Sequence, residues 1–225
     1  MKTAFDALAQ SYDMRIAGAA RQWTVESTID SLQSISRITG RVCELGCGTG
    51  LYSRAIANAG CVVCAVDFSF PMLAAAKRSG TGRLVCADCS KPLPFEDATF
   101  DVVASFDALT YVADLDFVFR ESKRILKRGG WFFAVVPNAL SVVRALARSA
   151  RLGGYAAGGP EERHGFRKKN LRKQIEAIFG PGGVRVIRPV PGFASGVFTQ
   201  APSALRPLFF SQWIGLGLLA WGRKT

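Results

Sequence analysis

Short apolar runs alternate with helical segments over the first 137 residues, and this alternation restricts the fold more than any other feature of the sequence. The runs are rich in Val, Phe or Cys and are apolar at both odd and even positions, which is typical of strands buried on both faces of a parallel sheet. They are Arg41–Leu45, Cys61–Asp67, Arg83–Asp88, Phe100–Phe106 and Gly130–Pro137. Helices are expected at Leu51–Ala59, Ser69–Arg78 and Asp116–Leu126. Right-handed crossovers through such helices predict a three-layer α/β fold with ligands at the carboxyl ends of the strands.

Two regions lie outside this alternation. Residues 1–39 contain a helical run from about Val25 to Ile38, and residues 138–183 contain a basic stretch, a Gly-rich hinge and a helix near Lys168–Phe179. The apolar stretch Leu208–Trp221 is too short to span a bilayer. We interpret Ile214–Trp221 as the last core strand; a surface patch that contacts lipid is the alternative.

Composition limits the class of protein and its compartment. The chain has 225 residues, 49% of them apolar, which suits one domain with a substantial core. An acid at Asp6 and the absence of an apolar signal core near the start argue against secretion. Six cysteines are too few for a disulfide scaffold in a chain of this size, so we expect a cytoplasmic protein.

The net charge of +12 is very unevenly distributed. Residues 1–134 hold 15 Lys and Arg against 14 Asp and Glu, whereas residues 135–225 hold 14 Lys and Arg against only three acids, Glu161, Glu162 and Glu176. The basic region predicts an acidic counterpart: an anionic substrate, an anionic membrane surface or a nucleic acid. A solvated basic surface without a partner is the alternative.

The strongest chemical signal is the stretch Val42–Gly50, where a buried strand turns into a helix. Gly46, Gly48 and Gly50 would let backbone N–H groups approach a ligand without a Cβ in the way. Asp67 ends the second run, where a carboxylate can accept both hydroxyls of a ribose, and Asp88 ends the third, where a carboxylate can bind an adenine amino group.

A dinucleotide-binding G-x-G-x-x-G motif is the rival interpretation. That motif requires Gly at position 51, which is Leu51 here. The glycines also follow an acid, Glu44, and a carboxylate beside a diphosphate would be repulsive, whereas it suits the ammonium of an amino acid.

With these residues the sequence resembles the class I S-adenosylmethionine-dependent methyltransferases, in particular the small-molecule group that includes the ubiquinone- and menaquinone-type enzymes. The resemblance covers roughly residues 5–136 and rests on five motifs in order. They are the N-terminal Phe5–Asp13, the glycine stretch Val42–Gly50, Ala65–Leu73, Leu93–Val103 and Leu126–Trp131. It implies a Rossmann-like sandwich with a mostly parallel seven-stranded sheet and an antiparallel last strand. The single domain would comprise lid helices in 1–39, a cofactor-binding core in 40–137, a basic cap in 138–183 and final strands in 184–225.

The resemblance also implies S-adenosyl-L-methionine as cofactor and a role for each contact. The glycine turn and Glu44 would hold the methionine moiety, Asp67 the ribose, and Asp88 the adenine amino group. Side chains after the second and fourth strands would flank the adenine and close the site, with Tyr12 as a lid. The implied cofactor-binding residues are Tyr12, Glu44, Gly46, Cys47, Gly48, Gly50, Asp67, Phe68, Met72, Asp88, Cys89, Ser105 and Phe106.

The reaction would be in-line attack of an acceptor on the sulfonium methyl group, with alignment and exclusion of water as the main work of the enzyme. A base is needed only for a protonated acceptor. Many relatives carry a histidine pair after the fourth strand, where this chain has Thr110 and Tyr111. His164 is the only histidine and our first candidate base, although a surface or structural histidine is the alternative; Asp107 and Tyr111 follow.

The pairs Cys61/Cys64 and Cys86/Cys89 have the spacing of zinc half-sites. Residues three apart on a strand point to opposite faces, so we interpret these cysteines as small buried core thiols and expect no metal site.

We expect a small-molecule acceptor that is acidic or lipid- or quinone-like, with contact to an anionic membrane as a further expectation. Nucleic acid is not expected, because the fourth strand is followed by Ser105-Phe-Asp-Ala108 and no RNA-binding module is appended. An RNA or protein methyltransferase and a non-catalytic cofactor-binding scaffold remain the alternatives. The sequence does not indicate the oligomeric state.

Overall fold

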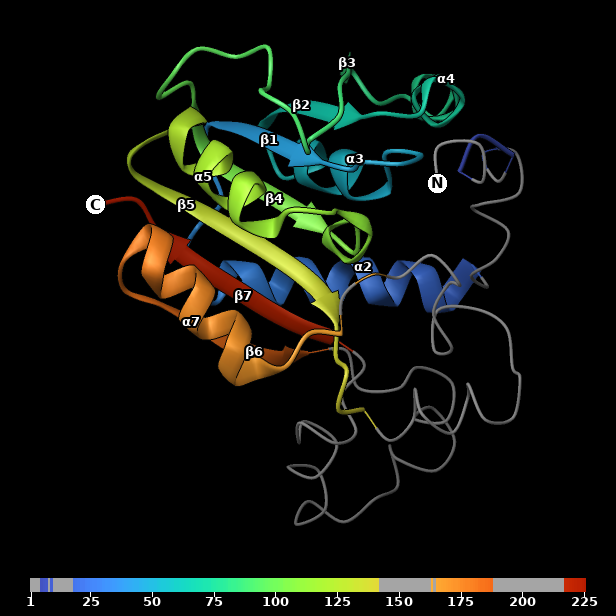
Figure 1. Ribbon diagram of the computed structural model, residues 1–225. Coiled ribbons are helices and arrows are strands. Elements are labelled where there is room, and N and C mark those ends of the chain that lie inside the picture. Colours follow the sequence, from blue (N-terminus) through green and yellow to red (C-terminus); the bar gives the residue numbers. More distant parts are fainter. Residues whose placement is uncertain (1–4, 8, 10–17, 142–162, 164, 188–216) are drawn as a thin grey trace, which may run out of the picture.

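The computed structural model describes residues 5–7, 9, 18–141, 163, 165–187 and 217–225. Seven strands form one sheet in the order β3-β2-β1-β4-β5-β7-β6, with helices on both faces (Figure 1). The strands are β1 (Arg41–Leu45), β2 (Val62–Asp67), β3 (Arg83–Cys86), β4 (Phe100–Phe106), β5 (Leu126–Pro137), β6 (Gly182–Ile187) and β7 (Gly217–Arg223). The helices are α2 (Gly18–Gln33), α3 (Leu51–Asn58), α4 (Phe70–Arg78), α5 (Leu115–Ile125), α7 (Lys168–Phe179) and the short 3-10 turn η2 (Leu109–Tyr111).

The strand pairing confirms the predicted fold class. Strands β1 to β5 pair in parallel, and β7 runs antiparallel to both β5 and β6. The last strand continues past Trp221 to Arg223, which pairs with Trp131 of β5. The expected beginning of that strand at residues 214–216 lies outside the described residues.

Two helix layers bury the sheet. On one face Phe119 of α5 and Phe179 of α7 pack on Phe132 of β5, whose ring stacks on Phe179 with centroids 4.8 Å apart. On the other face Leu32 of α2 and Ile56 of α3 belong to a second buried cluster. Its strand residues are those that point to that face, such as Phe133 of β5. The predicted division into lid, core, cap and final strands stays a prediction. Leu32 of α2, which falls in the predicted lid, is fully buried in the core.

Helix boundaries follow local capping chemistry. The Ser69 hydroxyl accepts from Met72 N–H at 3.3 Å and begins α4, with Pro71 in the first turn. Asp114 caps α5 by accepting from Phe117 N–H at 2.9 Å. The expected end of α5 at Leu126 is wrong by one residue, because Leu126 already pairs with Phe100 and begins β5.

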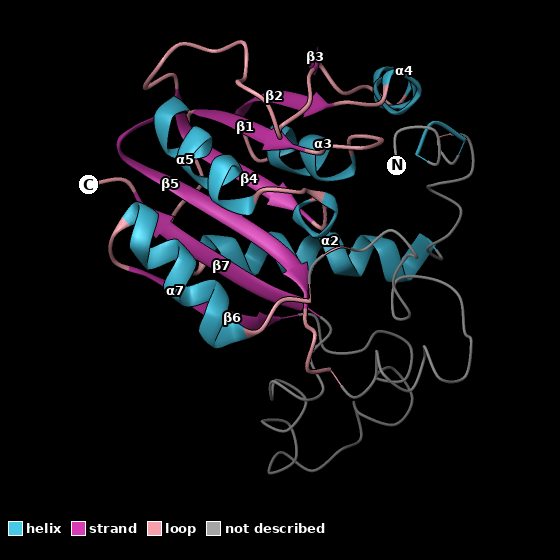
Figure 2. Ribbon diagram, viewed as in Figure 1, coloured by secondary structure: helices cyan, strands magenta, loops and turns pink. Residues whose placement is uncertain are grey.

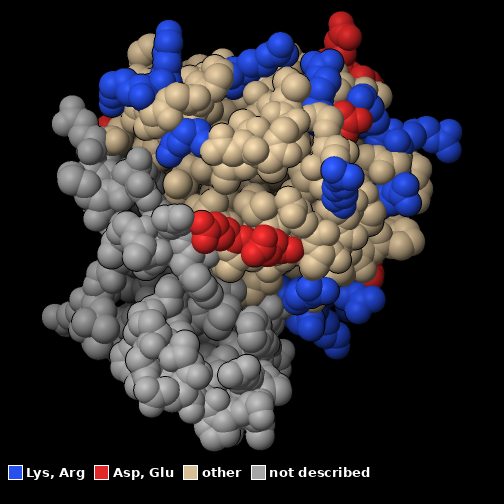
Figure 3. All heavy atoms as spheres, turned by 180° about the vertical axis from the view of Figure 1, so that it is seen from behind, with Lys and Arg blue, Asp and Glu red and all other residues tan. Residues whose placement is uncertain are grey.

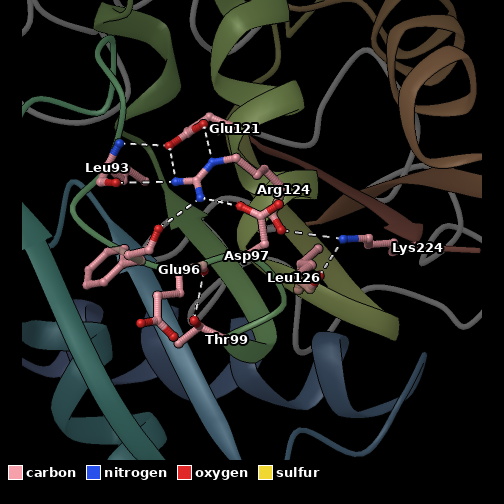
Figure 4. A network of polar contacts seen from close by, with 9 residues as sticks. Leu93, Glu96, Asp97, Thr99, Glu121, Arg124, Leu126 and Lys224 are labelled. Carbon is pink, nitrogen blue, oxygen red and sulfur yellow. Dashed lines mark hydrogen bonds and ion pairs between the residues drawn. The ribbon is translucent and has the colours of Figure 1, made fainter.

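A polar network anchors the loop that leads into β4 (Figure 4). The Arg124 guanidinium donates to Asp97 and Glu121 and to the carbonyls of Leu93 and Phe95. Glu121 in turn accepts from Leu93 N–H at 2.7 Å. The motif Leu93–Val103 therefore owes part of its pattern to this structural network. Within the described part of the chain, none of the helices is both long and apolar enough to cross a bilayer.

Candidate functional site

The parallel strands bring the predicted site to one edge of the sheet. Because β1, β2, β3 and β4 are parallel, their carboxyl ends lie together, as the arrowheads in Figure 2 show. Glu44, Asp67 and Phe106 lie at or next to these ends, and Asp88 follows β3 by two residues. Four features lie at this edge: a glycine turn, a buried acid, an aromatic lid and the region after β4.

The glycine turn after β1 is locked to the end of β2. Gly46 N–H and Cys47 N–H both donate to the carbonyl of Val66, at 2.8 and 2.9 Å. Gly48 N–H donates to Asp67 Oδ2 at 2.8 Å, and Ser69 N–H donates to Oδ1 at 2.9 Å. Burial raises the pKa of Asp67, while these backbone donors act in the opposite direction. Asp67 therefore joins the two loops that the resemblance assigns to the cofactor.

Gly50 is required at its position in the turn. Its φ of +77° is left-handed, and an added Cβ would lie 2.1 Å from Thr81 Oγ1 and 3.2 Å from Ala76 Cβ. The turn thus sits directly on the α4–β3 connection, which leaves no room for a side chain there.

Glu44 is a buried acid behind the turn. Its side chain is only 1% exposed, and the Ser53 hydroxyl of α3 donates to its Oε2. Burial raises the pKa of Glu44 to about 8, against the opposing effects of Ser53 and Arg54. The carboxyl therefore keeps its proton at neutral pH unless a cation comes close. Sequence reasoning missed Ser53, because nothing in a helical pattern marks a serine as the partner of an acid nine residues earlier.

An aromatic lid joins the two sides of this edge. The Phe5 ring lies edge-on to Phe68, with centroids 6.0 Å apart, and edge-on to Tyr111, with centroids 5.0 Å apart. The Ser69 hydroxyl donates to Asp6 Oδ1 at 2.5 Å. Residues near the N-terminus thus contact both the loop after β2 and the turn after β4. The predicted lid residue Tyr12 lies outside the described residues.

The adenine side of the predicted site contains Asp88 and Cys89, both half-buried. Asp88 Oδ1 accepts from Ser90 N–H at 2.9 Å. Burial raises the pKa of the Cys89 thiol to about 12, and the charges of Asp88 and Asp67 add to this effect. Both carboxylates therefore act on the same thiol. Met72, predicted to flank the adenine, is 2% exposed, whereas Phe68 is half-buried.

The region after β4 contains two of the three candidate bases. Asp107 has a left-handed φ of +61°, a strained conformation for a residue other than glycine, and its N–H donates to Val135 O at 2.7 Å. Tyr111 is half-buried against Phe5. His164 lies outside the described residues, although the neighbouring Arg163 N–H donates to Thr110 O at 2.8 Å.

The side chains at the end of β4 make well-defined contacts. The fully buried Ser105 hydroxyl donates to Leu45 O at 2.9 Å and so ties β4 to β1. Phe106 stacks on Tyr52 of α3 with centroids 4.1 Å apart. These contacts make both residues part of the floor at this edge.

The cysteine interpretation is right for one residue and wrong for another. Cys61 is buried and its thiol donates to Ile38 O, but Cys86 is exposed, because β3 is an edge strand of the sheet. Cys64 and Cys89 are half-buried. Among the described residues, no group of three or more His, Cys, Asp or Glu side chains could hold a metal ion.

Comparisons with known proteins agree with this geometry. A family model described as a methyltransferase domain matches residues 43–134. A demethylmenaquinone methyltransferase of Streptomyces griseus is 32% identical over 132 residues, which are 56% of this chain and 55% of that protein. A malonyl-[acyl-carrier protein] O-methyltransferase of Erwinia pyrifoliae is 35% identical over 128 residues, which are 52% of this chain and 47% of that protein. The matches thus span about half the length of these curated relatives.

Solved structures share the fold at low sequence identity. A SAM-dependent methyltransferase of Thermotoga maritima, described as a possible histamine N-methyltransferase, has a TM-score of 0.73 at 16% identity and covers 100% of both chains. A chain in the Haloferax volcanii complex of the Trm112 methyltransferase activator with a methyltransferase has a TM-score of 0.71 at 19% identity, covering 97% and 96%. The resemblance and the Rossmann-like fold class expected from the motifs are therefore confirmed.

Proposed function

We propose that this chain, which matches a methyltransferase domain and has the fold of S-adenosylmethionine-dependent methyltransferases, is an enzyme. It transfers a methyl group from S-adenosyl-L-methionine to a small-molecule acceptor. The acceptor is acidic or lipid- or quinone-like. One observation carries the proposal: Asp67 accepts hydrogen bonds from Gly48 and Ser69, next to a buried Glu44 that holds its proton. This arrangement offers separate contacts for a sugar and for an ammonium group.

The residues present fit this cofactor. Asp67 receives one N–H on each oxygen, and a carboxylate has further lone pairs with which to accept ribose hydroxyls. A cationic ammonium near Glu44 would release the carboxyl proton, since opposite charge favours the ionised form. Asp88 and Cys89 would meet the adenine, as their position after β3 suggests. The cofactor supplies an activated methyl group on a sulfonium sulfur.

The rest of the catalytic work falls to alignment and exclusion of water. Phe5, Phe68 and Tyr111 would shield the site, and Phe106 on Tyr52 would form its floor. For a protonated acceptor the base is His164, Asp107 or Tyr111. The strained backbone of Asp107 supports a functional role, because strain of this kind clusters at active sites.

The named activities of relatives support the small-molecule class. They act as demethylmenaquinone, ubiquinone biosynthesis O- and malonyl-[acyl-carrier protein] O-methyltransferases. For this chain the acceptor within that class is part of the proposal.

Two measurements test it. Calorimetric titration with S-adenosylmethionine should show binding that Asp67→Asn weakens and the exposed Asp30→Asn leaves unchanged. Label from the methyl donor, incubated with a cell extract, should then enter the organic phase or small acidic metabolites. Label in RNA or protein, or binding with no transfer at all, would contradict the proposal. In the same assay, His164→Ala with an unchanged pH–rate profile would exclude His164 as the base.

A further inference from the structure

Five basic residues crowd the beginning of α7, over Arg167, Lys168, Lys169, Arg172 and Lys173, and we call them the α7 basic face. All five side chains are exposed, whereas Leu171, Ile175 and Phe179 of the same helix are buried against the sheet. The helix is therefore amphipathic, and the beginning of the helix carries exposed cations. We propose that the α7 basic face docks the acceptor side of the protein onto an anionic phospholipid surface, an inference that rests on the lipid-like acceptor of the proposed function.

The position of these charges opposes helix stability. The N-terminus of a helix carries partial positive charge, so acids are favoured there and cations are disfavoured. The first turn of α7 contains no acid, and the N-cap residue Arg167 makes no side-chain capping hydrogen bond. Folding therefore gains nothing from the charges of Arg167, Lys168 and Lys169 at this end of the helix, which points to a partner outside the chain.

The charges are largely free to meet such a partner. Arg172 Nε pairs with Glu176 Oε1 at 2.8 Å. Within the part of the chain that the structure describes, the other four members of the α7 basic face form no ion pair. On the face seen in Figure 3, from behind the view of Figure 1, basic side chains form separated groups with some acidic side chains between them.

The beginning of α7 is tied to the same edge as the candidate site. Phe166 forms a parallel bridge with Asn138 just after β5, and its carbonyl accepts from Ala139 N–H at 2.9 Å. Three residues earlier, Arg163 N–H donates to Thr110 O beside Tyr111. In Figure 1 the first turn of α7 lies near the arrowhead of β5. A surface that binds the α7 basic face would thus lie close to the region after β4 that contains the candidate bases Asp107 and Tyr111, where the acceptor would bind.

The shape of the face favours a surface over a single small anion. From Arg167 to Lys173 the cations spread over about 9 Å of a helix, at 1.5 Å per residue. All five side chains are exposed, whereas a cavity of about 150 Å³ in this structure lies elsewhere, between α3, β2 and residues 80–83. Exposed cations spread around the beginning of a helix match many lipid phosphates at a surface better than one enclosed small anion.

The same face lacks what single-stranded nucleic acid binding uses. Stacking of bases requires exposed aromatic rings among the cations. Among the described residues the exposed large apolar side chains are Val62 and Phe70, and neither is on α7. We therefore expect electrostatic attachment to headgroups.

Vesicle sedimentation tests the proposal. The protein is mixed with phosphatidylcholine vesicles with or without about one-third phosphatidylglycerol, at about 0.1 M and about 0.5 M NaCl. The triple variant K168Q/K169Q/K173Q is compared with K77Q/R78Q/K91Q, which removes the same charge from exposed positions on α4 and the following loops. Thermal melting of each variant checks folding, and removal of charge from α7 should leave its stability equal or higher.

We expect the wild type and the α4 variant to bind only the anionic vesicles and only at low salt, and the α7 variant, which lacks three lysines, to bind about a hundredfold more weakly. Equal loss in both variants, or unchanged binding of the α7 variant, would overturn the proposal. Binding of the wild type to neutral vesicles would also overturn it. So would binding of the wild type to an acidic protein but not to anionic vesicles. Cofactor titration without vesicles is independent: its failure would contradict the proposed function, whereas cofactor binding without vesicle binding would contradict the docking surface alone.

Discussion

Replacing Glu44 with Gln should change how the stability of the protein depends on pH. In the native state burial raises the pKa of Glu44 from 4.5 to about 8, whereas the unfolded chain restores the ordinary value. Between these values the native state binds the proton and the unfolded state does not. The stability from this carboxyl is therefore fully present below pH 4.5 and is lost as the pH rises through about 8.

The magnitude follows from the same shift. At about 1.36 kcal/mol per pKa unit, the interval from 4.5 to about 8 corresponds to an upper limit of about 5 kcal/mol across the window. Gln cannot ionise but can still accept a hydrogen bond from Ser53. E44Q should therefore gain stability relative to the wild type as the pH rises from about 5 to about 8.

Urea unfolding at intervals between pH 5 and pH 9, followed by tryptophan fluorescence, measures this difference. Glu96→Gln is the matched control, because Glu96 is exposed and its loss should leave the pH profile parallel to that of the wild type. Parallel profiles for E44Q and the wild type would refute the assignment of a protonated Glu44. Calorimetry of cofactor binding in two buffers of different ionisation enthalpy gives a second readout, since an ammonium near Glu44 should release a proton below about pH 8.

Three further substitutions have defined expectations. Gly50→Ala should destabilise the fold by about 2 kcal/mol and weaken cofactor binding, because its Cβ would meet Thr81 Oγ1 at 2.1 Å in a left-handed backbone; unchanged urea midpoints would contradict this. Phe5→Ala should weaken cofactor binding by about fivefold to tenfold in calorimetry through loss of two ring contacts, whereas the exposed Phe70→Ala should not. Arg124→Met should cost about 2 kcal/mol in urea unfolding with cofactor affinity unchanged, and equal stability would show that its network contributes nothing.

The sequence alone was sufficient to place strands β1 to β4 and the helices α3 and α4 between them. Apolar runs such as Phe100–Phe106 are buried on both sheet faces wherever they sit in a parallel sheet, so their local pattern predicts them. Capping residues such as Ser69 and Asp114 mark helix starts through contacts three residues away. Once parallel strands are expected, Glu44 and Asp67 must lie at the same edge.

Tertiary structure alone decided which distant groups meet. The Ser53 hydroxyl on Glu44, Phe5 between two rings, and Arg124 on the loop before β4 are contacts across elements that no local period encodes. The exposure of Cys86 depends on the order of strands in the sheet, which places β3 at the edge. Local patterns record which segments form strands and helices, whereas the partners of a residue, and its exposure on an edge strand, depend on how helices and strands far apart in the chain pack together.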